Sequence, residues 1–285
     1  MKKVIMTPNP YRDKNFKYAT QAARILTDAG IESKTCLAFD VDRNFEMPQD
    51  IPLYDLQKEL RDGELLICFG GDGTILHASK AATRAGVPVL GVNIGTMGFM
   101  AELESSELAE LARLAKDEYT LDERMMLHVK AVHEGQVILE DDALNDAVIT
   151  KGAVARTIQL GVRCDNVEMM SFMGDGLILS TPTGSTAYSM SAGGPIVEPS
   201  AQNFIITPIC AHDMMTKAMV TSAERKITVE IGRIGRKNAF LSVDGGRAVR
   251  LNTGDTITIT RSRYVTKLVR LNNRSFFDIV KNKLK

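Results

Sequence analysis

The 285-residue sequence lacks an excess of charge of either sign, because 35 lysines and arginines balance 35 aspartates and glutamates. This balance excludes the overall basic field that drives non-specific binding to nucleic acid. Cysteine is scarce as well. Cys36, Cys68, Cys164 and Cys210 are widely scattered and form no C-x-x-C pair, so we expect reduced cysteines rather than a metal site.

Long apolar segments are also missing. No stretch approaches the length of a membrane span, and the N-terminal residues 1–8 include two lysines but too short an apolar run for a signal peptide. With 44% hydrophobic residues the chain can still bury a substantial core, and its length suits two medium domains. We therefore expect a cytoplasmic protein of two domains, with no membrane and no nucleic acid among its partners.

The two best-known phosphate-binding motifs are absent too. A P-loop needs Gly-Lys-Ser/Thr, which occurs nowhere, and the dinucleotide fingerprint G-x-G-x-x-G would have Leu76 at its third glycine. What the chain does contain is Gly70-Gly-Asp-Gly-Thr74, between the apolar run 64–69 and the helix-like run 74–85. A glycine-rich turn from strand to helix, with one carboxylate at its centre, indicates a phosphate site that carries its own base.

Glycines allow close approach of the backbone, so the N–H groups of this turn can point at phosphate oxygens at the positive end of a helix. Asp72 would repel a polyphosphate unless it binds a metal ion, orients an attacking hydroxyl or accepts the proton of that hydroxyl. The same residues also fit an ordinary turn in which the glycines make the bend and Asp72 caps the helix. The motif alone leaves both interpretations open.

From Lys2 to about Lys116 short β-rich runs alternate with longer helical ones, which is typical of βαβ units. This pattern predicts an α/β N-terminal domain, residues 1–117, with a parallel Rossmann-like sheet and helices on both faces. Ligands of such sheets bind beyond the carboxyl ends of the strands. Both 70–74 and the next loop, 93–99, fall there. We expect strands at 4–6, 35–39, 65–69 and 88–92. Helices are expected at 15–29, in the segment that begins after Asp72 and is ended by Gly86, and at 106–116.

After Asp117 the pattern changes to many short strands separated by hairpin signals such as Asp244-Gly245-Gly246. It predicts an all-β sandwich C-terminal domain, residues 118–263. The last segment, a strand at 264–271 and an amphipathic helix at 275–284, is expected to return to the first domain, so that 264–285 joins it. The strands of the sandwich are expected at 125–132, 137–140, 147–150, 157–162, 176–180, 204–209, 226–231, 239–243 and 256–260.

The β-rich half holds a second unusual run, Thr181-Pro-Thr-Gly-Ser-Thr-Ala-Tyr188. Its small hydroxyl residues supply hydrogen bonds at short reach, suited to a base edge or a ribose, and Tyr188 offers a ring to a planar group. A Ser/Thr-rich turn with a buried tyrosine would have the same composition.

Together, and with Asn145-Asp146 between them, these motifs resemble the NAD kinase family along nearly the whole chain. Residues 70–74 match the phosphate loop of that family, Asn93-x-Gly-x-x-Gly-Phe99 matches its second glycine loop, and 181–188 followed by 193–195 matches its most distinctive run. The first motif is shared with lipid kinases, but the combination in this order is highly specific.

The resemblance implies ATP-dependent phosphorylation of the 2′-hydroxyl of the adenosine ribose of NAD, giving NADP. Asp72 would orient and deprotonate that hydroxyl, and Mg²⁺ or another divalent cation would arrive with ATP, without a named protein ligand. The β-sandwich would bind NAD. The resemblance assigns nucleotide contacts to Gly70, Gly71, Gly73, Thr74, Phe99, Asn145, Asp146, Asp175, Thr183, Ser185, Thr186, Ala187, Tyr188 and His212.

Four motifs depart from the pattern of the family. Asp146 stands where Glu is common, Ala211-His212 where Pro-His is usual, Lys217-Ala218 where Arg-Pro is frequent, and 244–246 ends in Gly rather than Gln. Lysine keeps the charge of arginine but lacks the planar guanidinium with its paired N–H donors, which weakens the case for a bidentate anion contact. His212 fits a phosphate contact and a structural histidine about equally well.

Two competing functions follow from the same residues. A lipid or sugar kinase would share residues 70–74, although 181–188 argues against it. A non-catalytic NADP(H)-binding sensor would use the same pocket without turnover, against which the intact Asp72 argues only weakly. The resemblance also implies a homo-oligomer, most simply a homotetramer, with sites shared between subunits through the β domain.

Overall fold

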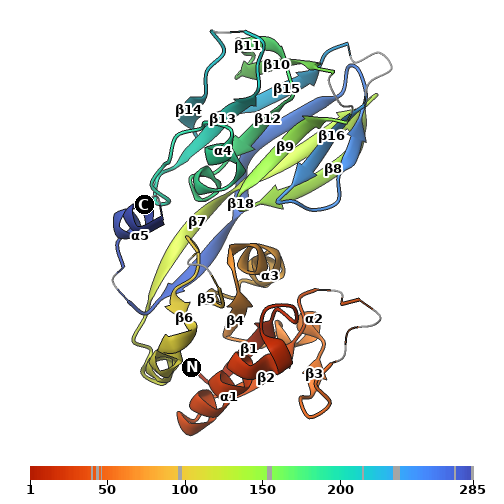
Figure 1. The fold of residues 1–285 in the computed structure, drawn as a ribbon. Helices are drawn as coiled ribbons and strands as arrows, with labels where there is room; N and C mark the ends of the chain where they lie inside the picture. The colour runs from red at the N-terminus through yellow and green to blue at the C-terminus, as the bar shows by residue number, and fades with distance from the viewer. Residues whose placement is uncertain are drawn as a thin grey trace. The chain divides into compact units, whose positions relative to one another are not determined.

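The structure is a computed structural model that describes residues 1–283 except 40, 43, 44, 46, 96, 97, 153–155, 214, 234–237 and 273. The chain divides into two compact units (Figure 1). Unit 1 comprises residues 1–123 together with 266–285, and unit 2 comprises 124–265. Among the described residues no helix combines the length and the apolar character needed to cross a membrane.

Unit 1 is built on a parallel sheet with the strand order β3-β2-β1-β4-β5. The short strand β6 extends it beside β5, and Leu268 near the end of β18 pairs in parallel with Val89 of β5. The predicted parallel sheet is therefore confirmed. The strands are β1 (Lys3–Pro8), β2 (Glu32–Cys36), β3 (Leu53–Tyr54), β4 (Leu65–Gly70), β5 (Val89–Asn93) and β6 (Leu103–Glu104).

Helices cover both faces of this sheet, which explains why every residue of β4 and β5 is buried. Helix α1 and the 3₁₀ segment η2 pack with one set of alternating strand side chains in a single core. On the other face Ile75 of α3 lies against Gly91, where a Cβ would be 2.3 Å from its Cδ1. The helical segments of unit 1 are η1 (Lys14–Phe16), α1 (Lys17–Asp28), α2 (Leu56–Glu59), α3 (Asp72–Ala85), η2 (Ser105–Lys116) and α5 (Phe276–Lys283).

Unit 2 is the predicted all-β part, and two sheets enclose its core. One sheet has the antiparallel order β14-β13-β12-β9-β16-β17, and the other contains β11-β10-β15-β18, with β7 and β8 added to β18. Strands β7 and β18 begin or end in unit 1. The strands are β7 (Thr120–His133), β8 (Gln136–Ala143), β9 (Asp146–Lys151), β10 (Ile158–Cys164), β11 (Val167–Gly174), β12 (Gly176–Ser180), β13 (Asn203–Ile209), β14 (Met219–Ser222), β15 (Ile227–Ile231), β16 (Ala239–Val243), β17 (Val249–Leu251) and β18 (Thr256–Arg270).

Three details differ from the sequence-based expectations. The strands expected at 256–260 and 264–271 form one long strand, β18. The segment expected as a helix at 106–116 is the tighter η2. Strands β3, β6, β11, β14 and β17 were not predicted. Strand β11 alternates between exposed and buried residues, but its three methionines are not among the residues enriched in strands and its glutamate is depleted there. Two short helical segments, η3 (Thr183–Thr186) and α4 (Tyr188–Ser191), complete unit 2.

Candidate active site

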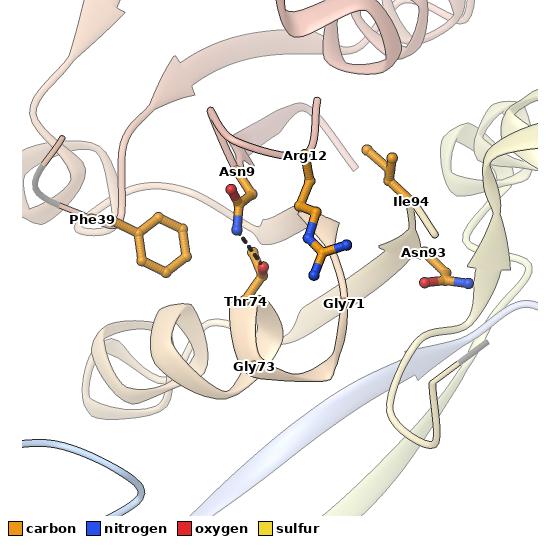
Figure 2. A pocket seen from close by; sticks show the side chains of 8 residues that line it. All are labelled: Asn9, Arg12, Phe39, Gly71, Gly73, Thr74, Asn93 and Ile94. Carbon is orange, nitrogen blue, oxygen red and sulfur yellow. Dashed lines mark hydrogen bonds between the residues drawn. The ribbon is translucent and has the colours of Figure 1, made fainter. Parts of the chain in front are cut away.

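A cavity of about 310 Å³ opens at the carboxyl ends of β1, β4 and β5 in unit 1, as the rule for parallel sheets predicts (Figure 2). Its lining contains three residues of the predicted phosphate loop, Gly71, Gly73 and Thr74. The other lining residues are Asn9, Arg12, Phe39, Asn93 and Ile94.

The glycines of the loop serve different purposes. A Cβ on Gly70 would lie 2.3 Å from Thr74 Oγ1, so this glycine is required by packing. A Cβ on Gly71 or Gly73 would meet nothing within 4 Å, and neither residue has a positive φ. The fold alone therefore does not demand glycine at these two positions. Because both line the cavity, their missing side chains leave room for a ligand at the backbone.

Helix α3 begins at this cavity. Gly71 is its N-cap residue, without a side chain to satisfy the first N–H groups, and Gly86 ends it in the left-handed conformation with φ 75°. Uncapped N–H groups at the positive end of a 14-residue helix favour an anion. The start of α3 therefore has the donors that the sequence predicted.

Asp72, the first residue of α3, is held by the second glycine loop. Its Oδ2 accepts a hydrogen bond from Phe99 N at 2.8 Å, and its Oδ1 accepts one from Met100 N at 3.1 Å. A Cβ on Gly98 would lie only 2.0 Å from Asp72 Oδ1. The two glycine loops therefore meet at this carboxylate, and each oxygen retains a lone pair for a further donor.

Two polar side chains support the cavity from neighbouring strands. Asn9 Nδ2 donates to Thr74 Oγ1 at 2.9 Å, as Figure 2 shows. Asn93 Nδ2 donates to Glu104 Oε2 at 2.8 Å, whereas the buried Oδ1 of Asn93 has no hydrogen-bond partner among the described residues. A buried acceptor without a donor is costly, so Asn93 Oδ1 is a position where a bound molecule would supply one.

Sequence reasoning missed Asn9, Arg12 and Phe39 in this cavity. Asn9 and Arg12 follow β1, and Phe39 follows β2. The signal was available, because the same rule that located 70–74 and 93–99 applies to the residues after every strand of the parallel sheet. Phe99, which was predicted as a nucleotide contact, makes a cation–π contact in which the Lys283 ammonium lies 4.2 Å from the centre of the ring.

The glycines allow a paired test. In Gly71→Ala the new methyl group enters the cavity and alanine replaces a glycine N-cap, so we expect a loss of about 1 kcal/mol or less in unfolding free energy and a KM for the phosphate-bearing substrate raised by about tenfold or more. In Gly98→Ala the methyl group meets the Asp72 carboxylate, so we expect a fall in kcat and a loss of about 1–3 kcal/mol in unfolding free energy. Thermal unfolding and steady-state kinetics of both variants distinguish the two effects. Equal destabilisation of both variants would contradict the assignment.

In unit 2 the corner Asn145-Asp146 is fixed by a carboxylate from another part of the chain. Asp244 Oδ2 accepts from Leu144 N at 2.7 Å, and its Oδ1 accepts from Asn145 N at 2.8 Å and Asp146 N at 3.1 Å. Asp244 itself has φ 48° and begins the predicted hairpin turn between β16 and β17. The sequence indicated the turn, but not this use of its side chain.

The Thr181 run packs directly on this corner. Thr181 N donates to Asn145 O at 2.9 Å, and Thr181 Oγ1 donates to Leu144 O at 2.5 Å. A Cβ on Gly184 would lie 2.1 Å from Asn145 O, so only glycine fits there. The structure therefore brings together two motifs that are separated by more than thirty residues in the sequence.

The predicted polar residues of unit 2 differ in how far their side chains are already satisfied. Ser185 is fully buried, and its Oγ donates to Pro182 O and accepts from Val197 N. Thr183 Oγ1 accepts from the buried Arg124, which sequence reasoning missed. Asn145 Oδ1 has no partner among the described residues. Thr186 Oγ1 donates to Thr183 O, Ala187 is half-buried, and Tyr188 is 44% exposed.

Asp146 is 6% exposed. Burial, together with the nearby charge of Asp244, raises the pKa of Asp146 to about 7. Its pKa in the unfolded chain is about 3.9. The folded state therefore binds the proton of the Asp146 carboxyl more tightly than the unfolded state does. The stabilisation from this bound proton is complete below about pH 4 and is lost as the pH rises to about 7.

Asp146→Asn tests this linkage, because an amide is neutral at every pH. We expect the variant to lose less stability than the parent chain between about pH 4 and pH 7, the difference amounting to a few kcal/mol at most. Urea unfolding at several pH values measures it. Asp28→Asn, at an exposed position of α1, is the matched control and should leave the pH profile unchanged. Parallel profiles for Asp146→Asn and the parent would contradict the raised pKa.

Two predicted residues lie away from this corner. Asp175 precedes β12, whereas Thr181 follows it, and the strand between them has five residues, or roughly 17 Å. Lys151 Nζ pairs with Asp175 Oδ1 at 2.6 Å. His212 is exposed, and its N donates to Met173 O, at the end of β12 where Asp175 lies. Asp175 and His212 therefore gather at one end of β12, and Asn145, Asp146 and the Thr181 run at the other.

Comparisons with known proteins cover nearly the whole chain. One family model, the ATP-NAD kinase N-terminal domain, matches residues 4–119, and another, the ATP-NAD kinase C-terminal domain, matches residues 144–271. An NAD kinase of Acetivibrio thermocellus is 39% identical over 100% of this chain and 97% of its own length.

Two solved structures are similar as well. An NAD kinase from Archaeoglobus fulgidus in complex with ATP has a TM-score of 0.74 at 25% identity, covering 100% of this chain and 98% of that one. Yeast NADH kinase complexed with NADH has a TM-score of 0.87 at 24% identity, covering 100% of this chain and 87% of that one, a likeness in fold.

Proposed function

Because this chain belongs to the ATP-NAD kinase family and has NAD kinase activity, we propose that Asp72 is the base of the reaction, in which ATP phosphorylates the 2′-hydroxyl of the adenosine ribose of NAD. The observation that carries this proposal is the position of Asp72. It lies at the start of α3, beside the cavity-lining glycines, and two backbone N–H groups orient its carboxylate.

In this proposal the cavity binds the phosphates of ATP. Gly71 and Gly73 bring backbone N–H groups to the phosphate oxygens, Thr74 contributes its hydroxyl because its own N–H already donates to Gly71 O, and the guanidinium of Arg12 offsets part of the phosphate charge. Phosphoryl transfer is largely a matter of positioning and charge neutralisation. Asp72 then accepts the proton of the attacking hydroxyl, and the new bond forms between the ribose oxygen and the γ-phosphorus as the bond to ADP breaks.

The proposal includes Mg²⁺ carried by ATP. Among the described residues no group of three or more His, Cys, Asp or Glu side chains could hold a metal ion. Mg²⁺ is commonly bound by substrate phosphates and one or two carboxylates rather than by a protein cage. When bound, the ion would neutralise charge on the phosphates, with Asp72 as the nearest carboxylate of the phosphate loop.

Unit 2 is proposed to hold NAD. The unsatisfied Asn145 Oδ1 supports this role, because a nucleoside hydroxyl would supply the missing donor. The neighbouring Asp146, the exposed ring of Tyr188, and the hydroxyls of Thr183 and Thr186 offer further contacts, whereas the hydroxyls of Thr181 and Ser185 are buried and already hydrogen-bonded within the chain. The proposed NAD contacts are Phe99, Asn145, Asp146, Asp175, Thr183, Ser185, Thr186, Ala187, Tyr188 and His212.

We also propose that the protein is a homotetramer in which subunits share NAD sites. Its support is the separation of Asp175 and His212 from Asn145 along β12, since one small substrate would reach both groups most directly if a second copy supplied one of them. The proposed compartment is the cytoplasm, in keeping with four free cysteines, Cys36, Cys68, Cys164 and Cys210.

The experiment is phosphoryl transfer by the purified protein, with Mg-ATP and either NAD, NADH or diacylglycerol. An NADP-specific dehydrogenase detects NADP, and thin-layer separation detects phospholipid. NADP formation that depends on Asp72 supports the proposal. Full activity without Asp72 would assign the base to another group.

A further inference from the structure

A buried ion pair adjoins the loop that holds Asp72. Arg270, the last residue of β18, and Glu102, just before β6, have side chains that are 17% and 2% exposed, and Arg270 Nη1 donates to Glu102 Oε2 at 3.2 Å. The described lining of the cavity includes neither of them. We propose that Arg270 is a positioning residue for phosphoryl transfer, because it fixes the backbone that orients Asp72. This inference rests on the proposed function of Asp72 as the base.

Two hydrogen bonds at one residue connect Arg270 with Asp72. Arg270 Nη1 donates to Met100 O at 3.3 Å, and Met100 N donates to Asp72 Oδ1 at 3.1 Å. Because Met100 is only 4% exposed, its carbonyl has little access to water as an alternative donor. Loss of the Arg270 contact would therefore leave Met100 free to shift, together with one of the two N–H groups that orient the carboxylate.

The guanidinium of Arg270 has the shape that this task requires. Its Nε and Nη2 donate to Asp122 Oδ2, near the start of β7, at 3.1 and 3.0 Å. Together with the two bonds from Nη1 to Met100 and Glu102, four of its five N–H donors are engaged by three residues. A lysine ammonium has the same charge, but as a point charge on a flexible stem it cannot reach these separate acceptors at once.

Glu102 holds the end of β18 through the backbone as well. Its Oε1 accepts from Leu271 N at 3.0 Å and from Asn272 N at 2.6 Å, the two residues that directly follow Arg270. A buried carboxylate is costly unless a charge and hydrogen bonds compensate it, and this one has both. Glu102 therefore fixes where Arg270 begins, and the guanidinium reaches back to Met100 from a defined position.

Arg270 and Asp122 lie close to the two points where the chain passes between its units. The unit boundaries fall within β7, between residues 123 and 124, and within β18, between residues 265 and 266. Strands β7 and β18 pair with each other, and the Arg270–Asp122 contact joins them within unit 1. The residue that positions Asp72 is thus supported by two paired strands rather than by a single loop.

Arg270→Lys and Arg270→Gln separate positioning from stability. Lysine retains the charge that compensates Glu102, so Arg270→Lys should keep most of the melting temperature, whereas Arg270→Gln should lose more of it. We expect kcat to fall by about tenfold to a hundredfold in both, the cost of a misplaced catalytic group, with nearly unchanged KM values. The lysine variant carries the test if the glutamine variant does not fold. A kcat that lysine restores would overturn the proposal.

Lys3 provides the matched control. Its side chain is 13% exposed, and its ammonium pairs with Glu59 at 2.7 Å and Asp62 at 2.6 Å, so it too is a largely buried cation between two carboxylates of unit 1. It begins β1, at the opposite end of that strand from the cavity. Lys3→Gln should lower the melting temperature and leave kcat unchanged. An equal loss of kcat in Lys3→Gln and Arg270→Lys would assign the effect to destabilisation and overturn the proposal.

A double-mutant cycle with Asp72→Asn determines whether Arg270 acts through Asp72. Single-turnover measurements at high enzyme concentration give the low rates. In the Asp72→Asn background, Arg270→Lys should lower the remaining rate by less than about threefold, because the group that it positions is gone. Equal effects in both backgrounds would overturn the proposal, since Arg270 would then act by another route. An Asp72→Asn variant with the kcat of the parent would instead reject the proposed role of Asp72, and this inference with it.

Discussion

Asp72→Asn is expected to lower kcat by about 10²–10⁴-fold, the range that a positioned general base contributes. An amide cannot accept the proton of the ribose hydroxyl. The substrates should still bind, because the glycine N–H groups and the residues of unit 2 are unchanged. Steady-state kinetics give kcat, and calorimetry with NAD and AMP-PNP gives the affinities.

The same substitution has a structural cost that needs its own control. Asp72 accepts hydrogen bonds from Phe99 N and Met100 N with different oxygens, and an asparagine side chain has only one oxygen. One backbone donor is therefore left facing an NH₂ group. We expect a loss of about 1–3 kcal/mol in unfolding free energy for this reason alone.

Asp13 provides the matched control. It is a buried carboxylate of unit 1 that also accepts two backbone hydrogen bonds, from Tyr18 N at 2.9 Å and Ala19 N at 3.0 Å, and it does not line the cavity. Asp13→Asn should lose similar stability and keep its kcat. If both variants lose activity in proportion to their stability, Asp72 has a positioning role and another group is the base.

The position of Asp72 also illustrates what the sequence can predict. The order of strands, glycines and helix around residues 70–74 is local, so periodicity and turn residues were sufficient to predict the turn and the parallel sheet. The predicted fold class is confirmed. The contact of Asp72 with the loop at 98–100 depends on two strand ends that become neighbours only in the sheet, and no local pattern encodes it.

Asp244 is a second residue whose contacts no local sequence pattern encodes. Its turn was predicted from Asp-Gly-Gly, but its three hydrogen bonds reach residues about a hundred positions away. The raised pKa of Asp146 follows from this long-range proximity and from burial, neither of which a single sequence contains. Missed residues such as Arg12 and Phe39 belong to a different class, because the strand-end rule would have found them. The individual substrate contacts stay predictions.

The division of the proposed NAD contacts between the two ends of β12 leads to the second large effect. Asn145 and Asp175 lie at opposite ends of a five-residue strand, and each is proposed to contact NAD. If subunits share sites, a chain with a defect at one end can still supply the other end to a neighbour. Two inactive variants would then repair each other, which no arrangement confined to one chain allows.

We therefore expect Asn145→Ala and Asp175→Ala each to be strongly impaired alone, and to regain activity in mixed oligomers. Co-expression with two different tags and purification through both gives the mixed species, and light scattering gives its mass. With random assembly about a quarter of the sites would receive both intact residues, so activity should rise toward that fraction of the parent.

Mixed oligomers of Asn145→Ala with itself, prepared with the same tags, are the control and should stay inactive. Two results would contradict shared sites: a monomeric mass at assay concentration, or mixed oligomers no more active than either variant alone. Either result would place all the NAD contacts within one chain. Asp175 and His212 would then have to serve another purpose.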